Sequence, residues 1–467
     1  MGAAASAARA DGSDTVTRRR IALLSLLVVI VVVAAALVVV GVIYRPMLRT
    51  GTGYAAHNAC AMHFVAGRRD DLETDLPPNP LVPLLRTEVD PSAGWASSSV
   101  LGVGFRQYAW ASEHGCAVGD ARAEGSQYTS LIRDPERAEE GSPEGIELPS
   151  VEDAPAEVDA ALDAAAAQEG TRGLVVVHDG RIIGERYGDG FGPDTRQLGW
   201  SVGKSAASTL VGRAQLEFPD ADLDRAGTGL RPEWTDERAQ ISLDNLLRMT
   251  SGLEWDEEYD LGTPITQMLF DEPDMAAFAA AQPLAHEPGT YRQYSSGTTN
   301  LICDLLHERT GLGPEMAEEL LFQPLGMRSA VLEADASGRS VCSSYLWATP
   351  RDFARFGQFA LDDGVVNGER LLPEGWMDYS TTVIPAGGEP EPYGAQWWVN
   401  VSGDGTPPRM DMPEDAYWAS GHDGQYVVVV PSADLVVVRT GFTPGASMSS
   451  LEVDRLVGAL AQAVGQQ

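Results

Sequence analysis

The amino-acid sequence predicts an α+β protein: an antiparallel sheet covered by helices in a three-layer α/β/α arrangement, with a mostly helical subdomain inserted between strands. Two β-hairpin patterns lie far apart in the chain, at 174–183 and 426–438. An alanine-rich helix pattern precedes the first hairpin, and an amphipathic helix pattern, 451–464, follows the second. The residues between the hairpins carry mainly helix signals, so we expect them to form an insert between strands of one sheet.

An apolar run near the N-terminus of the 467-residue chain predicts a single transmembrane helix. After Arg18–Arg20 come 23 residues, 21–43, without a charge or a proline. Such a run is long enough to cross a bilayer and longer than the apolar core of a cleavable signal peptide. Arginines before the run outnumber those after it, which predicts a cytoplasmic N-terminus at 1–20 and an outer location for the rest. The alternative is secretion after signal cleavage, because Ala34–Ala36 resembles a cleavage site.

Residues 44–132 are predicted to form a strand-rich outer segment. The stretches 84–89 and 100–105 are typical of strands, with a turn signal at Asp90–Ser92. Residues 133–152 are acidic and rich in Pro, Gly and Ser, which is a linker composition. The main domain is therefore predicted to span the remaining residues, 153–467.

Capping and turn signals justify the elements of the main domain in order. Asp153 and Pro155 open the first helix pattern, and Gly170 closes it. The first hairpin has an Asp179-Gly180 turn, and the second is a pair of valine-rich runs. Helix signals in the insert include 316–321 and 350–360.

The four cysteines have no metal-site spacing. An even number of cysteines outside the cytoplasm indicates two disulfides, most simply Cys60 with Cys116 and Cys303 with Cys342. Buried free thiols are the alternative, more so for the second pair than for the first.

Composition excludes one class of partner and singles out one residue. A formal charge of −34 argues against nucleic acid, because a binder must place Lys and Arg against phosphates. The chain contains a single lysine, Lys204. Lysine can release its proton in a protein, whereas arginine cannot. A lysine retained alone against this bias indicates a role that needs a neutral amine.

The stretch containing that lysine, Gly199–Ser205 (GWSVGKS), fits three motifs. A phosphate-binding loop is excluded, because Leu198 stands where its first glycine is required. The G-x-S-x-G nucleophile elbow needs a buried strand before the serine, but the polar loop 190–197 precedes it. The S-x-x-K pair fits, since Ser201 would open a helix and Lys204 would lie on the same face one turn on.

Two later motifs accompany this pair: Tyr294-Ser295-Ser296-Gly297 and His422-Asp423-Gly424. Together the three motifs resemble those of the serine β-lactamase and penicillin-binding-protein superfamily, which carries S-x-x-K, then Y-x-N or S-x-N, then K-T-G or H-x-G. The flanking segments 241–255 and 345–357 agree with this resemblance, which covers about 151–467. The pattern is most similar to a class C-like branch that includes 6-aminohexanoate-dimer hydrolase and related carboxylesterases, and it implies a β-lactamase/transpeptidase-like fold.

The resemblance also implies roles for individual residues. Ser201 would be the nucleophile, and Lys204 and Tyr294 would share a proton network with it. The backbone N–H groups of Ser201 and Gln425 would form the oxyanion hole. The resemblance gives substrate-binding positions to His422, Gly424, Ser296 and Tyr259, and it implies no metal and no cofactor.

Two departures from the family pattern shape the expected activity. Ser296 stands where many members have asparagine, and His422 stands where many have the lysine of K-T-G. Both changes remove contacts to β-lactams, so we expect hydrolysis of another small amide or ester through an acyl-enzyme on Ser201. The alternatives are a peptidoglycan D-peptidase or penicillin-binding protein, and a binding protein of this fold without turnover.

Overall fold

The computed structural model describes residues 10–68, 75–122, 145–151, 154–223, 230–401, 405 and 407–465. The main domain is built on a six-stranded sheet with the strand order β14-β15-β16-β17-β5-β6, in which every neighbouring pair is antiparallel. Its strands are β5 (Thr171–His178), β6 (Arg181–Tyr187), β14 (Trp398–Val399), β15 (Tyr417–Gly421), β16 (Gln425–Val430) and β17 (Leu435–Gly441). Both predicted hairpins are confirmed, and they meet through the pairing of β17 with β5.

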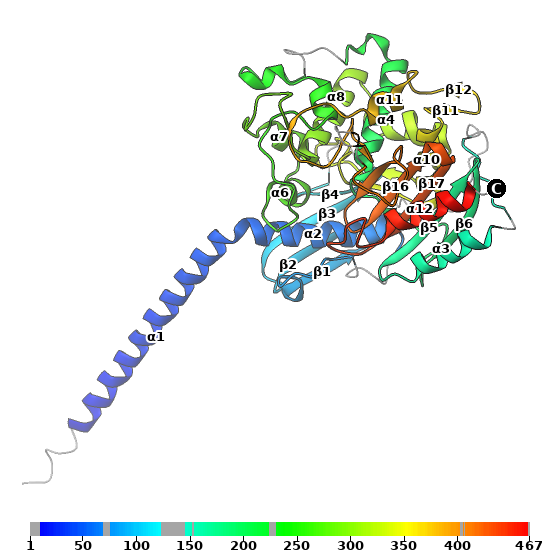
Figure 1. Ribbon diagram of the computed structural model, residues 1–467. Coiled ribbons are helices and arrows are strands. Elements are labelled where there is room, and N and C mark those ends of the chain that lie inside the picture. Colours follow the sequence, from blue (N-terminus) through cyan, green and yellow to red (C-terminus); the bar gives the residue numbers. More distant parts are fainter. Residues whose placement is uncertain are drawn as a thin grey trace, which may run out of the picture.

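Helices cover both faces of this sheet, which confirms the three-layer prediction (Figure 1). One face packs against α3 (Ala156–Ala166) and α12 (Val453–Val464), the helices expected at the two ends of the domain. The other face packs against α10 (Pro350–Leu361) and the helical subdomain. Because both faces are covered, β16 and β17 are buried at every position, which explains their continuous valine runs.

The helical subdomain is inserted between β6 and β14, as the sequence predicted (Figure 1). Its longer helices are α4 (Val202–Glu217), α6 (Pro264–Asp271) and α8 (Ser296–Thr310), and its shorter ones are α5 (Leu243–Leu247), α7 (Met275–Ala280), α9 (Gln323–Leu325) and α11 (Trp376–Thr381). Short strands connect them: β7 (Gln197–Leu198), β8 (Tyr291–Arg292), β9 (Val331–Leu332), β10 (Leu346–Ala348), β11 (Val365–Val366), β12 (Glu369–Arg370) and β13 (Gly387–Gly388). The helix signal at 316–321 corresponds to a single π-helical turn, Glu318–Phe322.

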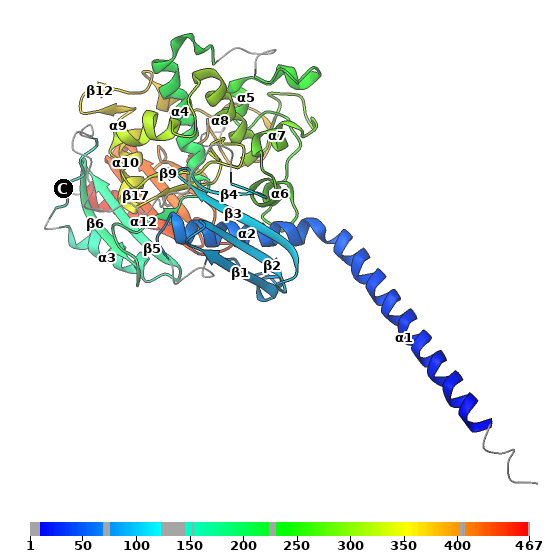
Figure 2. The ribbon, with the colours of Figure 1, turned by 180° about the vertical axis from the view of Figure 1, so that it is seen from behind.

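The segment before the linker combines a helix with a second sheet. This sheet has the order β1 (Leu85–Asp90), β2 (Trp95–Val100), β3 (Gly104–Ser112) and β4 (Gly115–Val118), and it packs on α2 (Arg45–Phe64). Figure 2 shows the four strands beside α2 at the base of the helical subdomain. The strand predicted at 84–89 is confirmed, but the strand predicted at 100–105 is interrupted by the turn 101–103 between β2 and β3, and α2 was not predicted. The linker predicted at 133–152 lies mostly outside the described residues.

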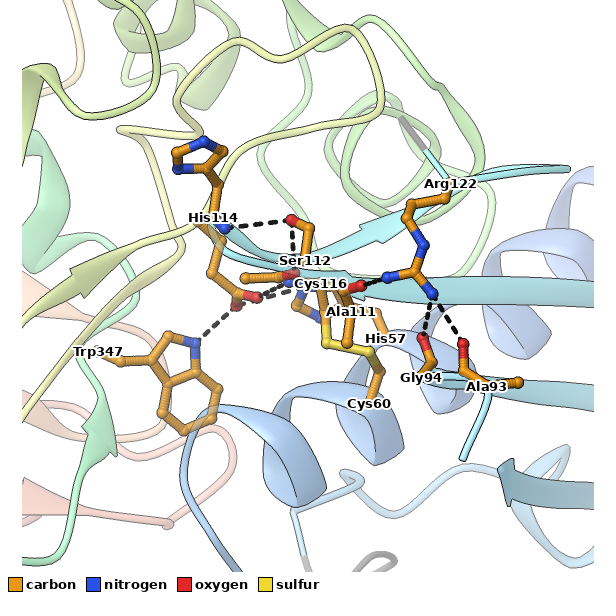
Figure 3. The surroundings of a disulfide bond; sticks show 12 residues. His57, Cys60, Ala93, Gly94, Ala111, Ser112, His114, Cys116, Arg122 and Trp347 are labelled. Atoms are coloured by element: carbon orange, nitrogen blue, oxygen red, sulfur yellow. Dashed lines mark hydrogen bonds and ion pairs between the residues drawn. A yellow bond between two sulfur atoms is a disulfide. The ribbon is translucent and has the colours of Figure 1, made fainter. Parts of the chain in front are cut away.

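Both predicted disulfides are present, Cys60–Cys116 and Cys303–Cys342. The first joins α2 to β4 beside Trp347 of the main domain (Figure 3). The carboxylate of Glu333 accepts hydrogen bonds from Cys116 N (2.5 Å) and from Trp347 Nε1 (2.7 Å). The outer segment is therefore fixed to the main domain by buried polar contacts as well as by packing.

The residues predicted to cross a membrane lie in α1 (Ala10–Ile43), a helix that projects away from the rest of the molecule (Figure 1). In the part of the chain that the structure describes, no helix is both long enough and apolar enough for a membrane crossing. The predicted span over 21–43 is therefore not supported by the described residues. Within that run the side chains of 33–38 and 40 lie outside the described residues.

Candidate active site

Ser201 lies immediately before α4, in a turn that two glycines allow to pack closely. A Cβ atom on Gly199 would lie 2.7 Å from the Phe353 ring, and one on Gly203 would lie 2.5 Å from the carbonyl oxygen of Cys342. Between them Trp200 is buried in the left-handed region, with φ of +49°. The glycines that produced a G-x-S-x-G pattern therefore serve the packing of α4 against the segment around Cys342.

Lys204 follows Ser201 by one helical turn and has an exposed fraction of only 1%. Its Nζ donates hydrogen bonds to Ser201 Oγ (3.0 Å), to Ser296 Oγ (2.7 Å) and to the carbonyl oxygen of Ser343 (3.1 Å). The spacing of three residues thus brings the two side chains of S-x-x-K into direct contact. Ser343 follows Cys342, so the second disulfide holds both α8 and the carbonyl group that positions the amine.

The environment of Lys204 makes its amine easier to deprotonate. Burial lowers its pKa from 10.5 to about 8, against the opposing effect of Glu257, whose carboxylate oxygen lies 3.7 Å from Nζ. About one amine in ten is therefore neutral at pH 7 and about half at pH 8, and this neutral form is the one that a general base needs.

The resemblance implied a substrate-binding position for Ser296. In the structure Ser296 belongs to this buried network and is not among the residues that line the cavity. Its side chain is fully buried, and its hydroxyl accepts from Lys204 while donating to Glu257 Oε1 at 2.5 Å. The backbone N–H of Ser296 and the indole N–H of Trp255 both donate to Glu257 Oε2. The sequence predicted no role for Glu257, which lies two residues before the predicted substrate-binding residue Tyr259.

Tyr294 lies close to both Ser201 and Lys204. Its ring centroid is 4.8 Å from Lys204 Nζ, and its ring stacks on Trp398 at 5.3 Å. Burial and the charge of Glu257 raise the pKa of Tyr294 above its ordinary value, while a hydrogen bond with Ser201 opposes that rise. The phenol is therefore protonated at neutral pH and is available as a proton donor.

A cavity of about 600 Å³ opens in front of these residues and is lined by Ser201, Tyr259, Tyr294 and His422 among others. The rings of Tyr259 and His422 stack at 4.0 Å, and Trp200 meets His422 edge-on at 5.6 Å. Burial lowers the pKa of His422 to about 4, which favours the neutral imidazole. Its Nε2 lies 3.3 Å from Oδ1 of the buried Asp423, and burial raises the pKa of that carboxyl to about 7, which favours its neutral form as well. The position that is a lysine in many family members thus carries no positive charge here.

Two further predicted residues, Gln425 and Gly424, are not among the residues that line this cavity. The side chain of Gln425 joins β16 to β17, because its Nε2 donates to Gly441 O (2.6 Å) and its Oε1 accepts from Gly441 N (3.0 Å). Gly424 is a turn residue with φ of +92°, and its carbonyl oxygen accepts from Arg439. The end of β15, at Ser420–His422, lines the cavity instead.

No metal site accompanies this arrangement in the described residues. Among them, no group of three or more His, Cys, Asp or Glu side chains is placed to hold a metal ion.

Comparisons with known proteins match this part of the chain. A family model described as Beta-lactamase matches residues 158–452. The 6-aminohexanoate-dimer hydrolase of Paenarthrobacter ureafaciens is 26% identical over 299 residues, covering 59% of this chain and 73% of that protein. The D-aminopeptidase of Brucella anthropi is 27% identical over 192 residues, covering 38% of this chain and 36% of that protein. The solved structure of a penicillin-binding protein homologue from Caulobacter crescentus has a TM-score of 0.53 at 17% identity, covering 66% of this chain and 97% of that one.

Proposed function

The chain belongs to the β-lactamase family of serine hydrolases, and from this membership we infer that it hydrolyses a small amide or ester through an acyl-enzyme on Ser201. The observation that carries the proposal is the position of the only lysine. Its buried amine lies 3.0 Å from Ser201 Oγ and has a pKa of about 8. A serine hydroxyl needs such a base before it can attack a carbonyl carbon.

The proposed reaction has two stages. Neutral Lys204 accepts the proton of Ser201 as Oγ bonds to the carbonyl carbon, and the carbonyl oxygen takes up the negative charge. The backbone N–H of Ser201, at the positive end of the α4 dipole, stabilises that charge, while the N–H groups of the next three residues donate to carbonyl oxygens of the preceding turn. Tyr294 donates a proton to the departing amine or alcohol and regains one through Lys204. Water then attacks the acyl-enzyme by the same route and releases the acid.

The second oxyanion donor is better sought at the end of β15 than at Gln425. Gly421 and His422 line the cavity with Ser201. A Cβ atom on Gly421 would lie only 2.0 Å from the carbonyl oxygen of Gly199, so the two backbone segments approach closely beside the nucleophile. We therefore assign the second N–H to this strand end, and His422, being neutral, contributes shape and stacking.

The substrate class follows from the chemistry of the cavity and from the relatives. A neutral His422 offers no charge to hold a β-lactam carboxylate, which favours other amides and esters. The names of the two curated relatives, a dimer hydrolase and an aminopeptidase, support an amide. Two disulfides support action in an oxidising compartment outside the cytoplasm.

The test is hydrolysis of p-nitrophenyl acetate by the purified protein, by Ser201→Ala and by Lys204→Ala. Both variants should lose at least about 100-fold in kcat/KM, since positioned proton transfer contributes on the order of 10² to 10⁴. Ser208→Ala is the matched control, because Ser208 is a fully buried serine two turns along the same helix. Activity that survives in Lys204→Ala would contradict the S-x-x-K mechanism, and an inert wild type would favour a binding protein.

A further inference from the structure

One wall of the active-site cavity comes from outside the part of the chain that the family model matches. The match begins at residue 158, yet residues of α2 and of the segment 76–85 line the same cavity as Ser201. The side chains that form this wall are Tyr54, Leu76, Pro77, Pro78, Asn79, Leu81, Val82 and Leu85, which we call the outer wall. The outer wall is therefore an addition of this chain to the family's catalytic domain.

Close packing fixes α2 at the cavity. The ring of Tyr54 stacks on Phe270 at 4.3 Å and meets Trp200, the neighbour of the nucleophile, edge-on at 6.3 Å. Gly53 allows this approach, since a Cβ atom there would lie 1.7 Å from the carbonyl oxygen of Phe270. Asp271 accepts hydrogen bonds from Arg49 (2.7 Å) and from Gln107 of β3 (2.6 Å).

The outer wall is mostly apolar, with Asn79 and the Tyr54 hydroxyl as its polar groups, and it continues onto the catalytic domain. Leu81 and Leu85 are buried in a small cluster that also includes Leu76 and Leu261, the latter from the loop after Tyr259. Gly51 lets the segment 76–85 and the loop after Tyr259 both contact α2, because a Cβ atom there would lie 2.3 Å from Leu81 and 3.1 Å from Leu261. The outer wall therefore offers a fixed hydrocarbon surface beside the reacting carbonyl.

The rest of the cavity lining disfavours a negatively charged substrate group. Its acidic side chains are Glu257, Glu258, Asp260 and Asp423, and none of the described lining residues is a lysine or an arginine. A substrate carboxylate placed here would meet the carboxylates of Glu257, Glu258 and Asp260. The amine of Lys204 is 1% exposed, lies outside the lining and is already paired with Glu257 at 3.7 Å.

We propose that the outer wall is the specificity surface of this hydrolase, and that it binds an uncharged aliphatic acyl chain of several carbons. This inference rests on the proposed function and extends it to the substrate. Burying one methylene group is worth about fourfold in binding. A hexanoyl ester should therefore have a kcat/KM at least tenfold higher than that of an acetyl ester. An ester whose acyl chain ends in a carboxylate should show no such gain over the acetyl ester.

The test compares p-nitrophenyl acetate, butyrate and hexanoate with wild type, Leu81→Ala and Leu84→Ala. Leu81 is 6% exposed and lines the cavity, whereas Leu84, three residues on, is 43% exposed and lies outside the lining. Leu81→Ala should lower the hexanoate-to-acetate ratio several-fold, and Leu84→Ala should keep the wild-type ratio. Leu76→Ala, at a half-buried lining position, gives the same comparison if thermal melting shows that Leu81→Ala does not fold.

Failure of this inference differs from failure of the proposed function. A flat chain-length profile, with activity that Ser201→Ala abolishes, would overturn the outer wall as a specificity surface and leave the acyl-enzyme intact. If no Ser201-dependent hydrolysis occurs, the outer wall can still be tested by calorimetry, which measures the binding of hexanamide, acetamide and hexanoate to Ser201→Ala. Tighter binding of hexanamide that Leu81→Ala removes would support the outer wall, and equal binding of the three would overturn it.

Discussion

Replacing Glu257 by glutamine should shift the pH dependence of the enzyme to lower pH. The carboxylate lies 3.7 Å from Lys204 Nζ and stabilises the ammonium form of the lysine, so it raises the lysine pKa against the effect of burial. Glutamine keeps an oxygen that can accept from Ser296 but removes the charge. Without that charge, the pKa of Lys204 should fall below its present value of about 8.

The size of the effect follows from the separation of the charges. Two unit charges 3.7 Å apart interact by about 1 kcal/mol in bulk water and by roughly 4 kcal/mol at an effective dielectric constant of 20. Since 1.36 kcal/mol corresponds to one pKa unit, the pKa of Lys204 should fall by about 1 to 3 units. Glu257 is partly exposed, with 19% of its side chain accessible, so the lower half of that range is expected.

The assay is kcat/KM for an uncharged ester between pH 5 and pH 10. Because the neutral amine is the active form, wild-type activity should rise with pH and level off above about pH 8. In Glu257→Gln this rise should occur at least about one pH unit lower. Glu254→Gln, an exposed residue of the same loop, is the control. A rise that stays at the wild-type pH in a folded Glu257→Gln variant would refute Lys204 as the titrating base.

Three further predictions follow from the same geometry. In ester assays Lys204→Arg should lose roughly 10² to 10⁴ in kcat/KM at every pH up to 10, because arginine keeps its charge. Near wild-type activity in this variant would be inconsistent with a neutral amine as the base. The double variant Cys303→Ser with Cys342→Ser should lose about 4 kcal/mol in free energy of unfolding by urea titration, since the disulfide closes a loop of 39 residues, and an unchanged value would contradict that reasoning. Nitrocefin should be turned over poorly in a spectrophotometric assay, because His422 is neutral at physiological pH, and efficient turnover would count against the proposed substrate class.

Local patterns in the sequence predicted the features that depend on neighbouring residues. The hairpins were visible because turn residues and valine runs are contiguous, and they are β5–β6 and β16–β17. The contact between Ser201 and Lys204 was predictable because three residues along a helix place side chains on one face. Both disulfide pairings were anticipated from the number and placement of the cysteines.

The tertiary structure alone decided which distant residues meet at the nucleophile. Ser296 is 92 residues from Lys204, and its hydrogen bonds with Lys204 and Glu257 depend on how α8 packs against α4. Likewise α2, more than 100 residues before Ser201, reaches the cavity only because its glycines allow close contact with α6 and Leu81. Local sequence specifies backbone conformation and the side chains on one face of an element, but the packing of whole surfaces determines which faces come together.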